Sequence, residues 1–206
     1  MIEKKKYNDT KQSYEKLGGR YLQSIRDLTP SDFYNFIKII PRSALVLDVG
    51  CAGGRDSRNF LDNGFRVVGI DVVEEFIEAS QRLYPEGKFY KMSVLDINFP
   101  EEQFDAIWAN AVLLHLDDED LVKALDNLRK VLKTKGTAFL SFKLGKEEAT
   151  VIDKLSDGEA RYFNFTNESK IIKLLEKFFK IDSYNIADDD ANRDDVKWIR
   201  LFLTKV

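Results

Sequence analysis

Apolar side chains near the start of the chain recur every three or four positions, which is the spacing of one face of a helix. Tyr14, Leu17 and Tyr21 follow this spacing, and the pattern starts again after Pro30. Because proline cannot continue a helix interior, we expect the second helix to end at Pro41. The N-terminal region is therefore predicted to be helical.

The middle of the chain changes to short, almost wholly apolar runs that alternate with amphipathic segments. The runs predict strands at 44–49, 65–70, 88–92, 104–110 and 137–142, and the segments predict helices at 55–63, 73–84 and 117–132. A strand that is apolar along its whole length is buried on both faces, as in a parallel sheet. The alternation therefore predicts an α/β fold whose parallel sheet is covered by helices on both faces.

The last third of the chain carries a different pattern. A polar stretch over 142–165 predicts no regular element, and a further amphipathic helix is predicted over 169–178. Two more strands are predicted at 180–186 and 196–205, on either side of an acidic turn at 188–190. Two strands joined by a short turn are usually antiparallel neighbours.

Composition limits the classes of partner. The 206 residues include 32 Lys and Arg against 35 Asp and Glu, and the formal net charge is −3. Without a large excess of positive charge, general binding of nucleic acid or anionic membranes is disfavoured. No apolar run approaches the roughly 18–20 residues that span a bilayer. Cys51 and His115 are single residues of their kinds, which excludes an internal disulfide and a Cys/His metal site. We therefore expect a cytoplasmic protein with no metal.

A glycine-rich turn follows the first predicted strand, at the place where ligands bind in an open α/β sheet. It reads Asp48-Val49-Gly50-Cys51-Ala52-Gly53-Gly54. The dinucleotide fingerprint G-x-G-x-x-G requires glycine where Ala52 and Arg55 stand, so it is absent. Asp48 would repel a pyrophosphate but can help to hold an ammonium group. Both features favour S-adenosylmethionine, which has an ammonium, a sulfonium and no phosphate, over NAD.

Two further acids follow predicted strands. Asp71 lies about 20 residues beyond the loop, where an acid can accept hydrogen bonds from both ribose hydroxyls of an adenosine cofactor. The alternative is that Asp71 caps the helix that follows it. Asp96 can accept from the adenine amine, with Val72 and Val94 packing on the ring, and a solvated loop acid is the alternative there.

Together these residues resemble the class I S-adenosylmethionine-dependent methyltransferases. The similarity covers the strand and loop at 46–57, the strand end at 69–71, the segment 104–115 and the helix and turn at 128–136. A less specific similarity over 161–198 is to small bacterial members of the tellurite-resistance type. One difference is Ala52, where the loop of the family usually has its middle glycine.

The resemblance implies a Rossmann-like three-layer sandwich with a seven-stranded, mostly parallel sheet and an antiparallel last strand. It implies that Asp48 and the backbone of Gly50, Cys51, Ala52, Gly53 and Gly54 hold the methionine end of the cofactor, with Asp71 at the ribose and Asp96 at the adenine.

No internal repeat or linker interrupts the sequence, so we expect a single domain over residues 1–206. In it, residues 1–41 form a helical lid, residues 42–145 form the cofactor-binding core, and residues 146–206 form the substrate side with the last two strands.

His115 is the candidate general base, because it follows the fourth predicted strand near the expected point of methyl transfer. It can act as the base or orient Asn110. The alternative is a packed histidine that caps the acidic helix start at Asp117. Asn110 lacks the Pro-Pro-Tyr that follows it in amide and base N-methyltransferases, which disfavours those acceptors.

The acceptor pocket is expected between the N-terminal helices and the segment after the fifth strand. Its candidate residues are Tyr14, Tyr21, Arg161, Tyr162, Arg193 and Trp198. The two arginines can bind an anionic acceptor or pair with nearby acids, and core packing is the alternative for the two N-terminal tyrosines. We expect in-line methyl transfer to a small molecule, by a monomer or homodimer. A non-catalytic module that binds S-adenosylmethionine or S-adenosylhomocysteine, and a nucleotide-cofactor dehydrogenase, are the alternatives.

Overall fold

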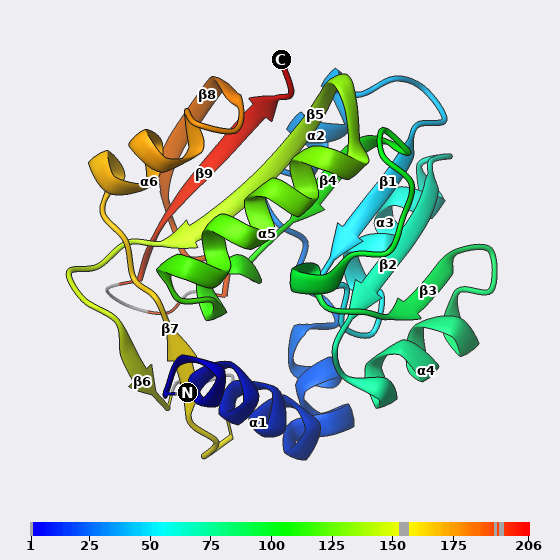
Figure 1. The fold of residues 1–206 in the computed structure, drawn as a ribbon. Coiled ribbons are helices and arrows are strands. Elements are labelled where there is room, and N and C mark those ends of the chain that lie inside the picture. Colours follow the sequence, from blue (N-terminus) through cyan, green and yellow to red (C-terminus); the bar gives the residue numbers. More distant parts are fainter. Residues whose placement is uncertain (1, 153–156, 192, 194–195) are drawn as a thin grey trace.

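The computed structural model, which describes residues 2–152, 157–191, 193 and 196–206, is built around a seven-stranded sheet (Figure 1). Its strands are β1 (Leu45–Val49), β2 (Arg66–Asp71), β3 (Lys88–Lys91), β4 (Phe104–Ala109), β5 (Leu132–Lys143), β8 (Lys180–Asp188) and β9 (Lys197–Thr204). The order is β3-β2-β1-β4-β5-β9-β8, with β1 to β5 parallel. β9 runs antiparallel to β5 and β8, which confirms the Rossmann-like sheet with an antiparallel last strand.

Helices cover both faces of this sheet, as the alternating pattern predicts. They are α2 (Phe33–Ile39), α3 (Arg55–Asp62), α4 (Glu74–Leu83), α5 (Asp118–Val131) and α6 (Glu168–Leu175), with short 3-10 turns η1 (Val94–Asp96) and η2 (Leu113–His115). Figure 1 shows α5 and α6 in front of the sheet and α2 and α3 behind it. Successive residues of a strand point to opposite faces, so Leu47 joins the core under α5 and Val46 joins the core under α2 and α3.

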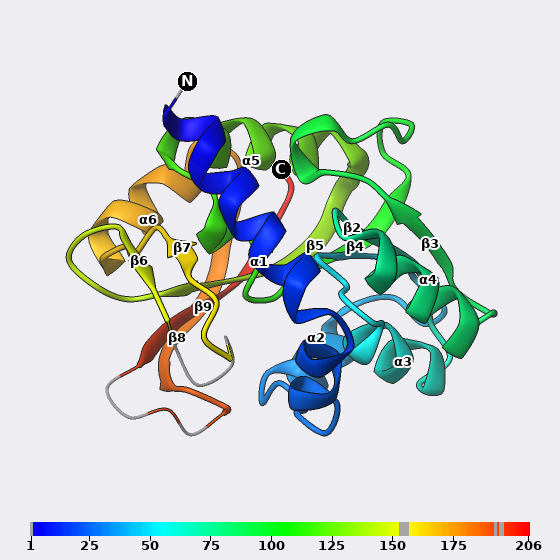
Figure 2. The ribbon, with the colours of Figure 1, turned by 90° about the horizontal axis from the view of Figure 1, so that it is seen from below.

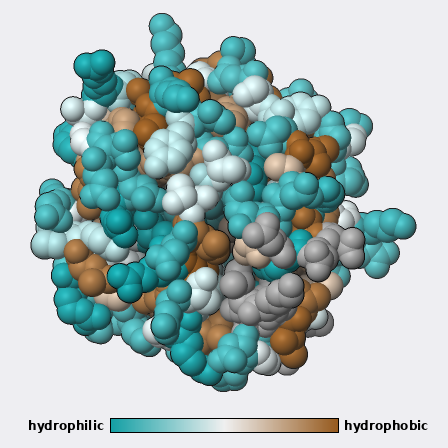
Figure 3. Space-filling view, turned by 180° about the vertical axis from the view of Figure 1, so that it is seen from behind, coloured by the Kyte–Doolittle hydropathy of each residue, from teal (hydrophilic) through white to brown (hydrophobic). Residues whose placement is uncertain are grey.

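The core under α2 and α3 is aromatic. Phe33, Phe36 and Phe60 surround Trp108, which stacks on Phe139 with ring centroids 4.1 Å apart. Burial of each such phenylalanine side chain stabilises the folded state by about 1.5–3 kcal/mol relative to leaving it exposed to water. The outer surface on this side is mostly hydrophilic, broken by small hydrophobic patches (Figure 3), so the helices bury their apolar sides inward.

The N-terminal helix α1 (Ile2–Ile25) lies across the carboxyl ends of the parallel strands (Figure 2). It is kinked at Gly18, whose φ and ψ of 49° and −134° are not helical. Among the described residues, no helix is both long and apolar enough to cross a membrane.

A second, two-stranded sheet occupies part of the polar stretch for which the sequence predicts no element. Its antiparallel strands are β6 (Ala149–Val151) and β7 (Arg161–Phe163), and β7 packs against α1. The N–H of Tyr162 donates to Thr10 Oγ1 at 2.9 Å, and Ser13 Oγ donates to the carbonyl of Ala160 at 2.6 Å. The periodicity of a three-residue strand is too short to detect, and these strands are fixed by contacts with a distant helix.

Two boundaries also differ from the sequence prediction. β5 begins at Leu132, which pairs with Phe104, rather than at residue 137. α6 ends at Leu175 rather than at 178, because the chain turns before β8.

Candidate functional site

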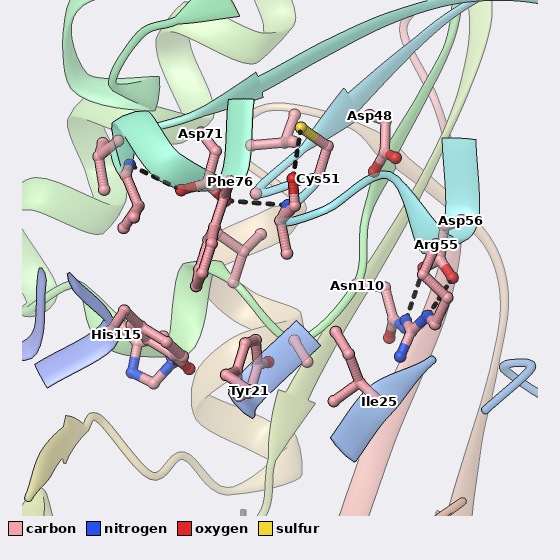
Figure 4. A pocket seen from close by; sticks show the side chains of 18 of the residues that line it. Tyr21, Ile25, Asp48, Cys51, Arg55, Asp56, Asp71, Phe76, Asn110 and His115 are labelled. Carbon is pink, nitrogen blue, oxygen red and sulfur yellow. Dashed lines mark hydrogen bonds and ion pairs between the residues drawn. The ribbon is translucent and has the colours of Figure 1, made fainter. Parts of the chain in front are cut away.

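A cavity of about 190 Å³ lies at the carboxyl ends of the strands, next to α1. Its walls come from α1, from the loops after β1, β2, β3 and β4, and from the turn between β8 and β9. Figure 4 shows Tyr21 of α1 across the pocket from Cys51, in the loop after β1, and Asp71, at the end of β2. The topology therefore brings Asp48, Asp71 and Asn110, three of the strand-end residues that the sequence singles out, to one cavity.

Backbone hydrogen bonds hold the loop after β1. The N–H groups of Gly50 and Cys51 both donate to the carbonyl of Ile70, at 2.8 and 3.0 Å. Gly50 has a φ of 68°, and a Cβ there would lie 2.5 Å from Val112 Cγ2, so glycine is required. Ala52 has a φ of 46°, a left-handed conformation that costs a residue with a Cβ about 1–2 kcal/mol. The loop thus keeps a glycine-like backbone at the position where it lacks the usual glycine.

Gly53 and Gly54 are not among the residues that line the cavity, whereas Gly50, Cys51 and Ala52 are. A Cβ on Gly53 would lie 2.8 Å from Leu22 Cδ1, and one on Gly54 would lie 2.7 Å from a ring carbon of Tyr84. These two glycines therefore allow close packing of the loop against neighbouring helices.

Asp71 ends β2 and faces the cavity. Its Oδ2 accepts from the N–H of Ala52 and its Oδ1 from the N–H of Val73, both at 3.0 Å. Burial raises the pKa of this carboxyl group, and the backbone N–H groups partly offset that rise. Val73, rather than Asp71, is the N-cap residue of α4, so the main contact of Asp71 outside its own turn is with the glycine-rich loop.

Asp48 is buried beneath the loop and accepts from Ser57 Oγ at 2.6 Å. Burial and the nearby carboxylate of Asp56 raise its pKa from 3.8 to about 7. The Asp56 carboxylate accepts from Arg55 Nε and Nη2, at 2.7 and 2.9 Å, and from Trp108 Nε1 at 2.8 Å. Arg55 and Asp56 line the cavity beside Asp48, a role for which their positions in the sequence give no signal.

The loop after β3 brings Met92 and Val94 to the cavity, together with Val72 from the loop after β2. It does not bring Asp96 there. The Asp96 side chain is 81% exposed and pairs with Lys123 at 3.3 Å. The turn η1 buries its first residue and exposes its last, so Asp96 has the environment of a solvated loop acid.

Asn110 and His115 both line the cavity after β4. Asn110 Oδ1 accepts from Ser141 Oγ at 2.8 Å, so Ser141 orients it. His115 lies with Nδ1 2.6 Å from the carbonyl oxygen of Tyr162 and Nε2 2.9 Å from Tyr14 Oη. Ser141 is thus a positioning partner of Asn110, and the orientation of Asn110 by His115 stays a prediction.

The start of α5 is capped by its own N-cap residue. Asp117 accepts from the N–H of Asp120 at 2.9 Å. The two ring nitrogens of His115 face the Tyr162 carbonyl of β7 and Tyr14 of α1, and the side chain that caps α5 is that of Asp117.

Comparison with known proteins agrees with this geometry. A family model described as "Methyltransferase domain" matches residues 46–136. A ubiquinone biosynthesis O-methyltransferase of Rickettsia bellii is 26% identical over 168 residues, which are 75% of this chain and 68% of that protein. An N-terminal Xaa-Pro-Lys N-methyltransferase 2 of Danio rerio is 25% identical over 78% of this chain and 62% of its own length.

The same fold occurs in a solved structure of the Burkholderia thailandensis 1,6-didemethyltoxoflavin-N1-methyltransferase with bound S-adenosylhomocysteine. The TM-score is 0.77 at 21% identity, over 97% of this chain and 87% of that one. A TehB-like S-adenosylmethionine-dependent methyltransferase of Corynebacterium glutamicum gives 0.69 at 19% identity, over 95% and 98%. The chain is a class I S-adenosylmethionine-dependent methyltransferase. Its cofactor is S-adenosylmethionine, and nothing in these matches points to a dehydrogenase or a non-catalytic module.

Four of the six acceptor-side residues predicted for this methyltransferase reach the cavity. They are Tyr14, Tyr21, Arg193 and Trp198. Arg161 and Tyr162 are not among its lining residues: Arg161 Nη1 donates to Tyr14 Oη at 2.9 Å, and the Tyr162 hydroxyl donates to Glu148. Arg193 is bound to the Asp189 carboxylate at 2.7 and 3.0 Å. Arg193 therefore pairs with an acid, as the alternative interpretation of this residue predicts.

The methyltransferase cavity also includes residues that the sequence analysis missed. Phe76 stacks on Tyr21 with centroids 5.8 Å apart, and Tyr7 lines the wall one helical heptad before Tyr14. Arg200 of β9 lines it as well and is bound by Asp190 at 2.8 Å. The seven-residue spacing of Tyr7, Tyr14 and Tyr21 was the one signal that could have placed all three on one face.

Proposed function

We propose that the protein transfers the methyl group of S-adenosylmethionine to a small-molecule acceptor by direct in-line displacement. The observation that carries this proposal is that α1 lies over the cavity and is tied to β7 and the residue before it by two hydrogen bonds. Thr10 Oγ1 accepts from the Tyr162 N–H, and Ser13 Oγ donates to the Ala160 carbonyl. A covered cavity admits a small molecule, whereas a protein tail or a nucleic acid would require α1 to move away. This supports a role of α1 as the lid.

We assign the cofactor to the half of the cavity formed by the loops after β1, β2 and β3. The methionine end lies against Asp48 and the backbone of 50–52, the ribose against Asp71, and the adenine between Val72 and Val94. Each Asp71 oxygen accepts one backbone hydrogen bond and retains a second lone pair for a ribose hydroxyl. The exposed Asp96 has no part in this assignment.

The charges of the cavity support a cationic cofactor. Among the described residues, its lining carboxylates are Asp48, Asp56, Asp71, Asp189 and Asp190, and its lining cations are Lys11, Arg55, Arg193 and Arg200. S-adenosylmethionine has an ammonium and a sulfonium against one carboxylate, so its excess positive charge offsets the excess of acids. A pyrophosphate would add negative charge beside Asp48 and Asp56.

When bound, the cofactor supplies a methyl group that the sulfonium makes electrophilic. The protein has to hold the acceptor atom in line with the methyl carbon, at about 3–3.5 Å, and to exclude water. Asn110, fixed by Ser141, lies between the glycine-rich loop and the acceptor side of the cavity and is suited to position either ligand. The acceptor side is formed by Tyr14, Tyr21 and Trp198.

The names of the relatives indicate more than one class of methyl acceptor. The Rickettsia and Burkholderia proteins are named for the methylation of small molecules, and the Danio protein is named for the methylation of a protein N-terminus. The covered cavity is what favours the first kind of acceptor for this chain.

Calorimetric titration with S-adenosylmethionine, S-adenosylhomocysteine and NADH tests the cofactor site. We expect the first two to bind and NADH not to bind. Asp71→Ala should weaken binding at least tenfold, because the ribose loses its acceptor and the loop loses the bond to Ala52. Asp96→Ala is the matched control and should leave affinity unchanged. Equal loss in both variants, or binding of NADH alone, would contradict the assignment.

Turnover is tested by following S-adenosylhomocysteine formation with a panel of small hydroxyl, amine and thiol compounds, and with a peptide and an oligonucleotide. We expect methylation of a small compound. Turnover of the peptide or oligonucleotide alone would contradict the proposal.

A further inference from the structure

The contacts of His115 fix which of its ring nitrogens carries hydrogen. A backbone carbonyl can only accept, so the nitrogen 2.6 Å from the Tyr162 carbonyl oxygen, Nδ1, is the donor. In the neutral imidazole Nε2 is then an acceptor. Nε2 lies 2.9 Å from Tyr14 Oη, so the phenol of Tyr14 donates to it.

Tyr14 connects this histidine to the cavity. Its oxygen also accepts from Arg161 Nη1 at 2.9 Å, and the guanidinium carbon lies 5.2 Å from the centroid of the Tyr14 ring. Burial raises the pKa of Tyr14 well above its ordinary value, so the group is a neutral phenol at rest. Tyr14 and His115 both line the cavity, and Figure 4 shows His115 at the side of the pocket near Tyr21.

The arginines of the cavity are already neutralised by the protein. Arg55 is bound by Asp56, Arg193 by Asp189 and Arg200 by Asp190, each with a contact of 2.7 or 2.8 Å. Lys11 pairs with Glu15 at 3.4 Å. An anionic acceptor would have to displace one of these carboxylates, whereas an uncharged one leaves every pair intact.

We propose that the acceptor is an uncharged phenolic hydroxyl compound, and that Tyr14 and His115 together take up its proton. This inference rests on the proposed function. The aromatic wall of Tyr14, Tyr21 and Phe76, whose rings lie 5.0 and 5.8 Å apart in successive pairs, suits a flat ring. An ordinary phenol has a pKa of about 10, close enough to the roughly 6.5 of histidine for proton transfer during the reaction.

The acceptor O–H proton passes to Tyr14 Oη as the Tyr14 proton passes to His115 Nε2. An oxygen lone pair forms the bond to the methyl carbon while the carbon–sulfur bond breaks and its electron pair stays on sulfur. The products are a methyl ether, S-adenosylhomocysteine and a His115 imidazolium, whose Nδ1–H is stabilised by the Tyr162 carbonyl. The imidazolium then loses its proton to solvent.

Tyr14 is the catalytic residue in this scheme, and His115 acts through it. Tyr14→Phe and His115→Gln should each lower kcat/KM for a phenol by about 100-fold or more, with S-adenosylhomocysteine affinity within about twofold of the parent, because neither residue is assigned to the cofactor. The matched control is Tyr34→Phe, since Tyr34 is a solvent-exposed tyrosine on α2 away from the cavity. The pH profile should rise through the histidine pKa in the parent and lose that limb in His115→Gln.

Because the chain has one histidine, ¹⁵N labelling of histidine reads its tautomer without overlap. We expect the neutral Nδ1–H form, with an Nε2 signal that moves in Tyr14→Phe and not in Tyr34→Phe. An Nε2–H tautomer would overturn the proposal.

The chemical class of the acceptor is tested with a matched series of aromatic compounds. Phenol and catechol carry hydroxyl groups, aniline and thiophenol carry an amine and a thiol, and benzoate is an anion. The proposal expects turnover of a phenolic member and none of benzoate. If the protein binds S-adenosylhomocysteine but methylates no phenol, or if Tyr14→Phe retains full phenol turnover, the proton path is wrong while the proposed function stands. Failure to bind S-adenosylhomocysteine would instead overturn the proposed function.

Discussion

The two halves of the cavity are held in place by different kinds of contact. On the cofactor half, bonds to backbone N–H groups between adjacent strands fix the loops: Gly50 and Cys51 donate to the Ile70 carbonyl, and the Asp71 carboxylate accepts from the N–H of Ala52. On the acceptor half, side chains join segments about 100 to 150 residues apart, as in Tyr14 with His115 and Lys16 with Glu159. The first half is part of the sheet, and the second is a cover assembled on it. We therefore expect substitutions in the first to affect folding and cofactor binding together, and those in the second to affect mainly the acceptor.

The largest expected effect is at Gly50. Gly50→Ala adds a Cβ that would lie 2.5 Å from Val112 at a φ of 68°, and should lower the free energy of unfolding by about 3–4 kcal/mol. Denaturant unfolding measures this. Gly64→Ala is the matched control, because Gly64 has a φ of 82° with no atom within 4 Å of a Cβ, and should cost about 1 kcal/mol. Equal losses in the free energy of unfolding for the two variants would show that the close approach of Gly50 to Val112 does not hold the loop.

Asp48 should make the cofactor half sensitive to pH. Its pKa in the folded protein is about 7, above the ordinary 3.8, so between these values the unfolded state binds fewer protons than the folded state. Stability should therefore fall as pH rises from about 4 to 7 and change little above that. At pH 8 Asp48→Asn should be more stable than the parent, because the amide has no charge to bury beneath the loop.

Denaturant unfolding of both proteins at pH 5 and pH 8 measures the difference. Parallel curves for the two proteins would contradict the raised pKa of Asp48. S-adenosylmethionine affinity should increase from pH 6 to 8 in the parent, because its ammonium favours the ionised carboxylate, and this increase should be absent in Asp48→Asn.

A smaller effect is expected in the cover. Thr10→Val leaves the buried N–H of Tyr162 without its acceptor, and should cost about 1–2 kcal/mol. Hydrogen exchange at that amide should quicken while exchange in β1 and β2 stays unchanged. Thr10→Ser keeps the hydroxyl and should restore protection. Faster exchange throughout the sheet would mean that the cover and the sheet unfold as one unit.

The smallest effect is at Ala52. Ala52→Gly removes the steric cost of a left-handed φ of 46°. Glycine also raises the conformational entropy of the unfolded chain, so the free energy of unfolding should rise by no more than about 1 kcal/mol. A loss of stability on denaturant unfolding would show that the alanine methyl contributes packing that outweighs its backbone strain.

The same contrast explains what the sequence could predict. Asp48 and Asp71 could be placed because each lies at the carboxyl end of a strand whose apolar run is visible in the sequence, and parallel strands end at one edge. Asp96 was misplaced because a single 3-10 turn decides which residue after β3 faces inward, and periodicity does not resolve a turn. The Arg55–Asp56 pair escaped notice because its role depends on Trp108, 52 residues away, which holds Asp56 in the core.

The acceptor side was predicted only in part for a similar reason. Tyr14 and His115 were each singled out, but nothing in the spacing of two residues 101 positions apart predicts that they share a hydrogen bond. That contact requires β7, whose three residues have no detectable pattern, to bring the Tyr162 carbonyl to His115 Nδ1.

A crystal structure of the protein with S-adenosylhomocysteine tests the central claim most directly. Our account predicts the ribose hydroxyls on the carboxylate of Asp71, the homocysteine portion over residues 50–52, and the sulfur directed toward the side of the cavity that contains Tyr14. A ligand bound elsewhere, or a cavity that stays empty at saturating S-adenosylhomocysteine, would contradict it.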